Sequence, residues 1–366
     1  MATDASDRSE NPAIRAVVVD DSRFMRTVIS NILEEGGIQV IGEASDGVEA
    51  IDVVKQSNPD VVTMDIEMPR MDGIEAVEEI MQEHPTPICM LSAHTDEGAG
   101  VTFEALEKGA VDFFTKPGGE ISAGISQHDD QLLKTVRSTA HADLDALPET
   151  SSGADSNTRG TVQSEHSYKD NPTVIIGAST GGPNVVEHIL GDLPRAAGLR
   201  ILVVQHMPNE FTARFAERLD RATSYAVREA SDGDRIGAGE VLVAKGGYHL
   251  EVAAFSRGRL RVKLTEDDAV HGVRPAIDIT METAAETITG PLTAVVLTGM
   301  GADGAAGVES VAKAGGHVIA QNEATSTVFG MPKRAIETGV VDDICSLGNL
   351  SEHIISSVTQ DGDSHE

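Results

Sequence analysis

Short runs of β-branched, apolar residues alternate with longer helix-like stretches along most of this 366-residue chain. Glycine-rich turns follow several of the runs. This alternation is typical of parallel strands joined by helices. In open α/β sheets the functional groups gather just beyond the carboxyl ends of the strands. The pattern therefore predicts an α/β fold whose chemistry lies at strand ends.

Five expected strands occupy the first part of the chain, at residues 16–20, 40–44, 61–65, 88–91 and 111–114. Helix-like stretches follow them in turn, near residues 22–35, 47–56, 73–84, 96–108 and 127–137. Strands that are connected through helices pair in parallel, with right-handed crossovers. This part of the chain therefore predicts one five-stranded, doubly wound parallel sheet.

Small polar residues separate this unit from a second one. The region from residue 138 to 171 includes Ser151–Asn157 and has the composition of a flexible linker. The boundaries that we expect are a polar tail over 1–13, a first domain over 14–137, a linker over 138–171, a second domain over 172–357 and a polar tail over 358–366.

The second domain again alternates strands and helices, which predicts a doubly wound, mostly parallel sheet. The segment from Val241 to Leu264 breaks the alternation, because short strand-like runs are joined there by Gly-Gly and Ser-Arg-Gly turns. Such turns favour antiparallel pairing. We expect an antiparallel hairpin region at one edge of the second sheet.

The chain carries a formal net charge of −31, from 59 acidic and 28 basic residues. Nucleic acids and anionic membrane surfaces require basic patches, so this charge argues against both as partners. Disorder could also explain the charge, but 40% of the residues are hydrophobic and fall into well-formed runs. We expect the acidic surface of a halophilic protein, whose self-repulsion is screened by the ions of a salt-rich cytosol. The alternative is an acidic protein from an organism that lives at ordinary salt concentration.

The polar residues Met1–Arg15 lack the apolar core of a signal sequence. No apolar stretch approaches the ~18 residues that a membrane span requires, so direct membrane insertion is not expected. Cys89 and Cys345 are too few and too far apart for a disulfide framework. The expected location is a reducing cytoplasm, and both cysteines are interpreted as buried, inert thiols.

Polar residues follow four of the expected strands in the first domain. Asp20 and Asp21 follow the first strand and Asp65 ends the third, so their carboxylates would form an anionic pocket suited to Mg²⁺. Ser92 follows the fourth strand and Lys116 the fifth, where they could hold phosphoryl oxygens with Asp65 as the nucleophile. The structural alternatives are a helix cap for the pair Asp20-Asp21 and an ordinary turn for Lys116-Pro117. The coincidence at four strand ends favours a phosphorylation site.

Four segments of this domain resemble the receiver domain of two-component response regulators, namely Val19–Ser22, Met64–Gly73, Leu91–Ala93 and Phe114–Pro117. The resemblance implies a flavodoxin-like fold and phosphorylation of Asp65 by a histidine kinase in the presence of Mg²⁺. It also implies that Asp21 and Asp65 ligate the ion, that Asp20 supports it through water, and that Glu67 offers its backbone carbonyl. The residues implied to respond to the phosphoryl group are Ser92, Lys116 and Phe113. For Phe113, the role of an ordinary core phenylalanine is an equal alternative.

Three strands of the second domain end in the residue types of a hydrolytic triad. Ser179 lies in a Gly-x-Ser-x-Gly motif, in which small neighbours permit a tight strand-to-helix turn. His206 follows a second apolar run, and Asp303 lies in a glycine loop after a third. A histidine oriented by a carboxylate can take the proton of the serine. A serine-capped glycine turn and a phosphate-binding loop remain alternatives for the motif.

Other catalytic arrangements fit the sequence less well. The motif lacks a Walker A lysine and the spacing of a dinucleotide fingerprint. No Cys/His cluster has zinc-ligand spacing, which disfavours metal-dependent hydrolysis. The chain order Ser–His–Asp differs from the Ser–Asp–His order of α/β-hydrolases, so any shared chemistry would be convergent.

Segments throughout the second domain resemble the protein-glutamate methylesterases of chemotaxis, namely Ile176–Pro183, Gln205–Pro208, Phe215–Leu219, Leu297–Gly301, Asp303–Gly304, Gln321–Ala324 and Phe329–Pro332. The order of receiver, linker and esterase matches that family as well. The resemblance implies a hydrolase that demethylates glutamyl methyl esters on methyl-accepting chemotaxis receptors and often deamidates glutamines, with no cofactor for the esterase. It aligns Ser179, His206 and Asp303 with the triad and places the backbone amide of Met300 at the oxyanion position.

Two departures from that family concern the surface around the site. Ala244-Lys245 stands where the family commonly has Ala-Pro, and Ala276 stands where it commonly has serine, before the helix that contains Asp278. One alternative function is a response regulator with a non-catalytic, receptor-binding output domain, against which the intact triad argues. A receiver fused to a DNA-binding factor is disfavoured by the charge and by the lack of a helix-turn-helix pattern.

Overall fold

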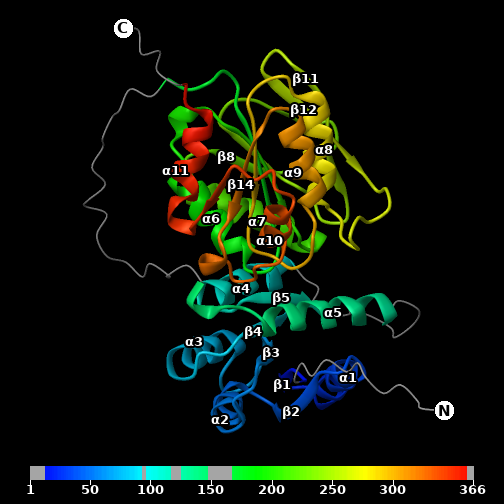
Figure 1. Cartoon of the computed structure of the whole chain (residues 1–366). Coiled ribbons are helices and arrows are strands. Elements are labelled where there is room, and N and C mark those ends of the chain that lie inside the picture. The colour runs from blue at the N-terminus through cyan, green and yellow to red at the C-terminus, as the bar shows by residue number, and fades with distance from the viewer. Residues whose placement is uncertain (1–12, 93–95, 117–124, 147–166, 361–366) are drawn as a thin grey trace, which may run out of the picture.

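The structure is a computed structural model that describes residues 13–92, 96–116, 125–146 and 167–360. Most of the expected N-terminal tail, the middle of the expected linker with Ser151–Asn157, and most of the expected C-terminal tail lie outside these described residues. Two α/β units account for nearly all of the described elements (Figure 1). None of the described helices combines the length and the apolar character that crossing a membrane requires.

The first unit is built on a five-stranded parallel sheet in the order β2-β1-β3-β4-β5. Its strands are β1 Arg15–Val19, β2 Gln39–Ala44, β3 Val61–Asp65, β4 Ile88–Ser92 and β5 Asp112–Thr115. Its helices are α1 Arg23–Glu35, α2 Gly47–Ser57, α3 Gly73–Glu83, α4 Asp96–Glu107 and α5 Ile125–Ala140. The predicted doubly wound sheet is confirmed.

Burial and capping explain why these elements form where the sequence predicts them. Every residue of β3 and β4 is buried, as expected for central parallel strands with helices on both faces. Ser22 accepts the N–H of Met25 at the start of α1. Asp72 and Glu75 form a capping box at the start of α3. These caps define where α1 and α3 begin after the ends of β1 and β3.

The second unit contains a seven-stranded sheet in the order β15-β14-β13-β6-β7-β10-β8, and all neighbours pair in parallel. Its strands are β6 Thr173–Ala178, β7 Arg200–Gln205, β8 Ala226–Glu229, β10 Glu240–Val243, β13 Leu292–Val296, β14 His317–Gln321 and β15 Asp343–Cys345. Helices α6 Gly182–Asp192, α7 Asn209–Ala222 and α11 Leu347–Val358 pack on one face. Helices α8 Ile277–Thr287, α9 Ala305–Lys313 and α10 Met331–Glu337 pack on the other.

The expected hairpin is present, but it does not lie at the edge of the seven-stranded sheet. Strand β11 His249–Ser256 pairs antiparallel with β12 Arg259–Thr265, and β9 Arg235–Ile236 joins them in a separate three-stranded sheet. The run that begins at Val241 instead forms β10 within the parallel sheet. Residues 241–244 are all buried, and such a fully apolar run suits a central parallel strand better than a hairpin arm.

The two units pack against each other through α4, β5 and α5 of the first and α6 and α7 of the second (Figure 1). Phe103 of α4 stacks on Phe215 of α7, with ring centroids 5.9 Å apart. Phe113 of β5 lies against Phe211 of α7, with centroids 4.4 Å apart. Arg218 of α7 donates to the carbonyl of Phe103. The hydrophobic core thus continues from one unit into the other.

Candidate active site and phosphorylation site

Ser179 lies between the end of β6 and the start of α6. Its N–H donates to the carbonyl of Thr298 at 3.0 Å, and its carbonyl accepts the N–H of Gly182 at 2.8 Å. Gly181, the N-cap of α6, has a φ of 76°, which favours glycine. The side chain of Ser179 is partly exposed at this turn. The motif therefore forms the predicted strand-to-helix turn.

The loop after β13 approaches Ser179 closely at Gly299. A Cβ atom at position 299 would lie 2.6 Å from the Cβ of Ser179, so only glycine permits this approach. Met300 follows, and within the described residues its N–H donates no hydrogen bond. A free backbone N–H next to the serine suits the stabilisation of an oxyanion.

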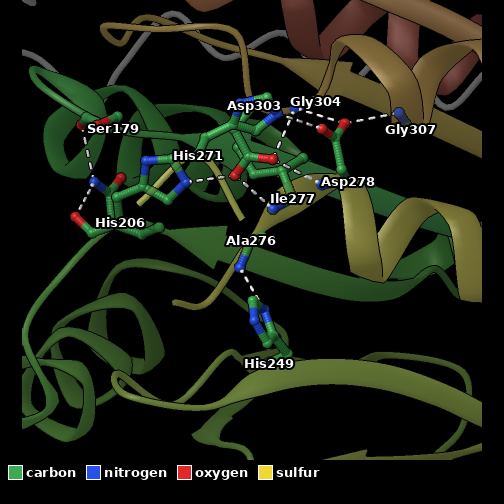
Figure 2. A network of polar contacts seen from close by, with 11 residues as sticks. Ser179, His206, His249, His271, Ala276, Ile277, Asp278, Asp303, Gly304 and Gly307 are labelled. Carbon is green, nitrogen blue, oxygen red and sulfur yellow. Dashed lines mark hydrogen bonds and ion pairs between the residues drawn. The ribbon is translucent and has the colours of Figure 1, made fainter. Parts of the chain in front are cut away.

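His206 follows β7, and Asp303 lies in the loop after β13. Atom Nε2 of His206 is 2.7 Å from Oδ2 of Asp303, and their side chains are 10% and 2% exposed. An ionised carboxylate only accepts hydrogen bonds, so Nε2 carries the proton and Nδ1 keeps a lone pair. The imidazole lies between Ser179 and Asp303 (Figure 2). Within the described chain the hydroxyl of Ser179 makes no hydrogen bond with His206; such bonds often tighten only with substrate.

Three backbone amides surround the carboxylate of Asp303. The N–H of Ile277 donates to Oδ2 at 2.7 Å, and the N–H groups of Asp278 and Gly304 donate to Oδ1, both at 3.0 Å (Figure 2). Burial raises the pKa of Asp303, but the hydrogen bond and charge of His206, with the amides, outweigh it and leave the pKa below its ordinary value. Asp303 is therefore an ionised group that orients the imidazole at neutral pH.

A second buried carboxylate, which the sequence reasoning did not assign to the site, lies beside Asp303. Oδ1 of Asp278 accepts the N–H groups of Gly304 and Gly307 at 2.9 and 2.7 Å, and Nε2 of His271 lies 3.0 Å from Oδ2. The potential ligand atoms of His271, Asp278 and Asp303 lie within 4.8 Å of one another. Most of the carboxylate oxygens already accept backbone N–H groups, so the arrangement suits hydrogen bonding better than a cation.

Gln205 is another site residue that the sequence reasoning did not single out. Its Nε2 donates to the carbonyl of Ser179 at 2.8 Å and to that of His206 at 3.1 Å. One buried side chain thus ties together the backbones of the nucleophile and the base. Its position directly before His206 was the available signal, but a glutamine at the end of an apolar run does not reveal its partner.

The residues predicted to form the phosphorylation site lie at the carboxyl edge of the first sheet. The ammonium of Lys116 lies 2.7 Å from Asp20 Oδ2 and 2.6 Å from Asp65 Oδ1. Carboxylate oxygens of Asp20, Asp21 and Asp65 lie within 4.8 Å of one another, and Asp21 is exposed. Burial raises the pKa of Asp65, and Lys116 partly offsets this effect. Clustered oxygen donors of this kind fit Mg²⁺.

The remaining predicted residues of this site are spread around it. Ser92 is buried at the end of β4, and its carbonyl accepts the N–H of Lys116 at 2.8 Å. Glu67 lies in the bend after β3 and is exposed. Phe113 is buried and packs against Phe211 of α7, so it contributes to the contact between the two units as well as to the core of its own domain.

Polar groups of the first unit also reach the turn that carries Ser179. The hydroxyl of Thr180 donates to Oδ2 of Asp112 at 2.7 Å, and the hydroxyl of Ser138 donates to Thr180 at 2.9 Å. Nearby, the side-chain amide of Asn184 donates to the carbonyl of Leu106 at 3.0 Å. The residue directly after the candidate nucleophile is therefore bonded to β5 and α5.

Family models match both units. Residues 16–126 match the response regulator receiver domain, and residues 174–354 match the CheB methylesterase. The crystal structure of the Thermotoga maritima CheB methylesterase catalytic domain is 42% identical, with a TM-score of 0.49 over 51% of this chain and 98% of that chain.

Curated relatives extend the match over nearly the whole chain. The protein-glutamate methylesterase/protein-glutamine glutaminase of Natronomonas pharaonis is 58% identical over 96% of this chain and 99% of its own length. Its counterpart in Haloarcula marismortui is 54% identical over 94% of this chain and 98% of its own length. Both relatives come from halophiles, in agreement with the acidic composition. The chain belongs to the protein-glutamate methylesterase/protein-glutamine glutaminase family, with a response regulator receiver domain before a CheB methylesterase domain.

Proposed function

We propose that this chain demethylates glutamyl methyl esters, and deamidates glutamines, on methyl-accepting chemotaxis receptors, with Ser179 as the nucleophile. The observation that carries the proposal is the pairing of His206 with the amide-bound Asp303 beside the turn of Ser179. Such an arrangement supplies a nucleophile, a base and an orienting carboxylate. A non-catalytic output domain would not require any of these groups to be held in this geometry.

In the first half of the reaction, the Oγ atom of Ser179 attacks the side-chain carbonyl of the substrate while Nδ1 of His206 accepts the hydroxyl proton. Asp303 stabilises the imidazolium that forms. The N–H of Met300 donates to the oxyanion. His206 then returns the proton to the leaving group, so methanol departs from an ester and ammonia departs from an amide.

The second half releases the receptor carboxylate from the glutamyl-serine ester. His206 takes a proton from water, and the resulting hydroxide attacks the acyl carbon. The Ser179 oxygen leaves with the proton from His206, which restores the free enzyme. Ester and amide substrates give the same acyl-enzyme, so one site serves both reactions.

Phosphorylation of the receiver domain controls this activity in the proposal. A histidine kinase transfers its phosphoryl group to the carboxylate of Asp65. Asp21, Asp65 and the carbonyl of Glu67 would hold Mg²⁺, with Asp20 supporting it through water. The bound ion would offset the negative charge of the phosphoryl group. Lys116 and Ser92 contact the phosphoryl oxygens, and Phe113 responds at the domain contact.

The protein would act in the cytoplasm. There the unphosphorylated receiver would restrict the access of substrate to Ser179. Support comes from Asp112 and Ser138, which bond Thr180 next to the nucleophile, and from Phe113, which packs on α7. Phosphorylation of Asp65 would weaken this docking by changing the surface formed by α4 and β5.

Release of methanol from radiolabelled, methylated receptor membranes tests the proposed chemistry. Wild-type protein with a small phosphodonor should release methanol in molar KCl. The Ser179→Ala protein should not, because the substitution removes the nucleophilic oxygen and leaves the rest of the site in place. A matched control is Ser310→Ala, which removes a hydroxyl from α9 that bonds only the carbonyl of Ala306. Near-wild-type turnover by a pure, folded Ser179→Ala protein would exclude the serine mechanism.

A further inference from the structure

Two helices beside the triad lack caps of their own. Helix α8 has Ala276 and helix α9 has Gly304 at the N-cap position, and neither provides a side-chain hydrogen bond. The first amide N–H groups of a helix have no partner within the helix, and a carboxylate is a favourable one. Each helix end therefore needs an acceptor from elsewhere in the chain.

Each helix receives that acceptor from the other segment. Asp303, just before α9, accepts the first N–H groups of α8, from Ile277 and Asp278. Asp278, in the first turn of α8, accepts the N–H groups of Gly304 and Gly307 at the start of α9. The two carboxylates also share the N–H of Gly304 (Figure 2). The position of Asp303 thus depends on Asp278 through a reciprocal cap.

A histidine accompanies each carboxylate. His206 lies 2.7 Å from Asp303, and His271 lies 3.0 Å from Asp278. The imidazole of His206 is nearly enclosed, whereas His271 is 44% exposed and in contact with solvent. His206 is the triad base, and His271 has no place in the triad mechanism.

We propose that Asp278 is a positioning residue for the esterase reaction, holding Asp303 in place through the shared cap. His271 orients Asp278 by a hydrogen bond from the solvent side. The inference rests on the proposed function, since it assumes that His206 is the base. It extends the site to residues that do not touch the reacting atoms.

The two carboxylates lie close together, and their surroundings compensate for this. Burial and the charge of Asp303 raise the pKa of Asp278 above its ordinary value, whereas the amide of Gly307 and the bond to His271 oppose this effect. Glu282, one turn further along α8, adds negative charge nearby. The N–H groups at the two helix starts therefore hold the pair of carboxylates in place against their repulsion.

Asp278→Asn separates charge from geometry, because the amide oxygen still accepts Gly304 and Gly307 and the amide nitrogen can donate to His271. The measurement is kcat and KM for methanol release, using the full chain with phosphodonor in molar KCl. Because the cap is kept, Asp278→Asn should retain kcat within about threefold of wild type. Glu286→Gln on α8 removes one exposed charge as the control and should leave both constants unchanged.

Asp278→Ala removes both the charge and the cap. Its kcat should fall by roughly 10- to 100-fold with KM little changed. The reason is that a displaced Asp303 stabilises the imidazolium of the transition state less well but does not contact the bound substrate. His271→Gln keeps a hydrogen-bond donor and should retain most of the activity. Circular dichroism checks that every variant is folded.

A folded Asp278→Ala protein with the kcat of wild type would overturn the proposal, as would an Asp278→Asn protein that loses as much kcat as Asp278→Ala. The proposed function fails separately in the same assay, if wild-type protein releases no methanol or Ser179→Ala releases it normally. The two failures are distinguishable because the first concerns variants of an enzyme whose wild-type form is active.

Discussion

The carboxylate of Asp112 in the receiver domain accepts a 2.7 Å hydrogen bond from the hydroxyl of Thr180 in the catalytic domain. Thr180 directly follows Ser179, and Asp112 directly precedes Phe113, which packs against Phe211 of the catalytic domain. The turn that carries Ser179 and the receiver domain are therefore joined through adjacent residues on each side. Changes in β5 can reach the serine turn without crossing an intervening element.

Replacement of Asp112 by alanine should raise the basal activity of the unphosphorylated protein. Below about pH 6, where Asp112 holds its proton, the docked state would lose a hydrogen bond worth about 1 kcal/mol, roughly a fivefold change in the docking equilibrium. Asp112 lies in the receiver, so a gain can arise only through the interface. The measurement is methanol release without phosphodonor. The control is Asp52→Ala, an exposed residue of α2 on the far side of the receiver (Figure 1); equal basal rates for the two variants would contradict the prediction.

Docking should also depend on pH through Asp112. Burial raises the pKa of Asp112 from 3.8 to about 6, despite bonds from Thr180 and the N–H of Phe113. Because the carboxylate contacts Thr180 across the interface, we expect undocking to expose it and to lower this pKa. The docked state therefore holds the proton more tightly, so docking strengthens as pH falls from about 6 and weakens as pH rises through that value. Small-angle scattering of the full chain should show a smaller radius of gyration at pH 5 than at pH 7.5. Asp112→Asn, which cannot titrate, should flatten this dependence; an unchanged slope would exclude Asp112 as the cause.

Asp303→Asn should lower kcat by roughly three to four orders of magnitude, somewhat less than loss of the serine. All four groups around the carboxylate donate hydrogen bonds, from His206, Ile277, Asp278 and Gly304. An asparagine would place its own N–H groups against some of these donors and would favour the wrong imidazole tautomer. Single-turnover methanol release measures the loss. Activity within tenfold of wild type would mean that Asp303 does not orient His206.

Much of the fold and of both sites follows from local sequence patterns. Strand ends locate Asp65, Ser179 and His206, because a parallel sheet brings its carboxyl ends to one edge whatever the length of chain between them. The caps at Ser22 and Asp72 are also local and could be expected from their residue types. These features can be predicted without knowing which helices pack against each other in the folded protein.

The features that the sequence did not predict depend on contacts between distant segments. The cap exchange between Asp278 and Gly304 requires two helix ends to face each other, which no periodicity encodes. The bond from Thr180 to Asp112 likewise arises from docking of two domains. The run at Val241 was assigned to the hairpin because short apolar runs occur both in parallel strands and in hairpin arms. Its complete burial, which identifies it as a parallel strand, depends on contacts with distant segments.

The acidic surface should make the protein more stable as salt rises. With 59 acidic and 28 basic residues, self-repulsion opposes the compact state until ions screen it. Thermal unfolding followed by circular dichroism should give a Tm that increases between 0.1 M and 3 M KCl. A neutral osmolyte at equal osmolality controls for preferential exclusion. A Tm that stays flat or falls with KCl would contradict the halophilic interpretation.

The final prediction concerns the direction of control by the receiver. The catalytic unit pairs its own ends, since the N–H of Lys169 donates to the carbonyl of Val358 and Tyr168 pairs with Thr359. A fragment over residues 167–360 should therefore retain this pairing and, without the contacts of Asp112 and Phe113, should turn over faster than the unphosphorylated full chain. Asp65→Asn in the full chain should remain at the low basal rate even with phosphodonor. The comparison is methanol release at equal concentrations of folded protein, with Ser179→Ala in the fragment as the blank. If the folded fragment is no faster than the unphosphorylated chain, the receiver does not inhibit by covering the site and must act by targeting or activation instead.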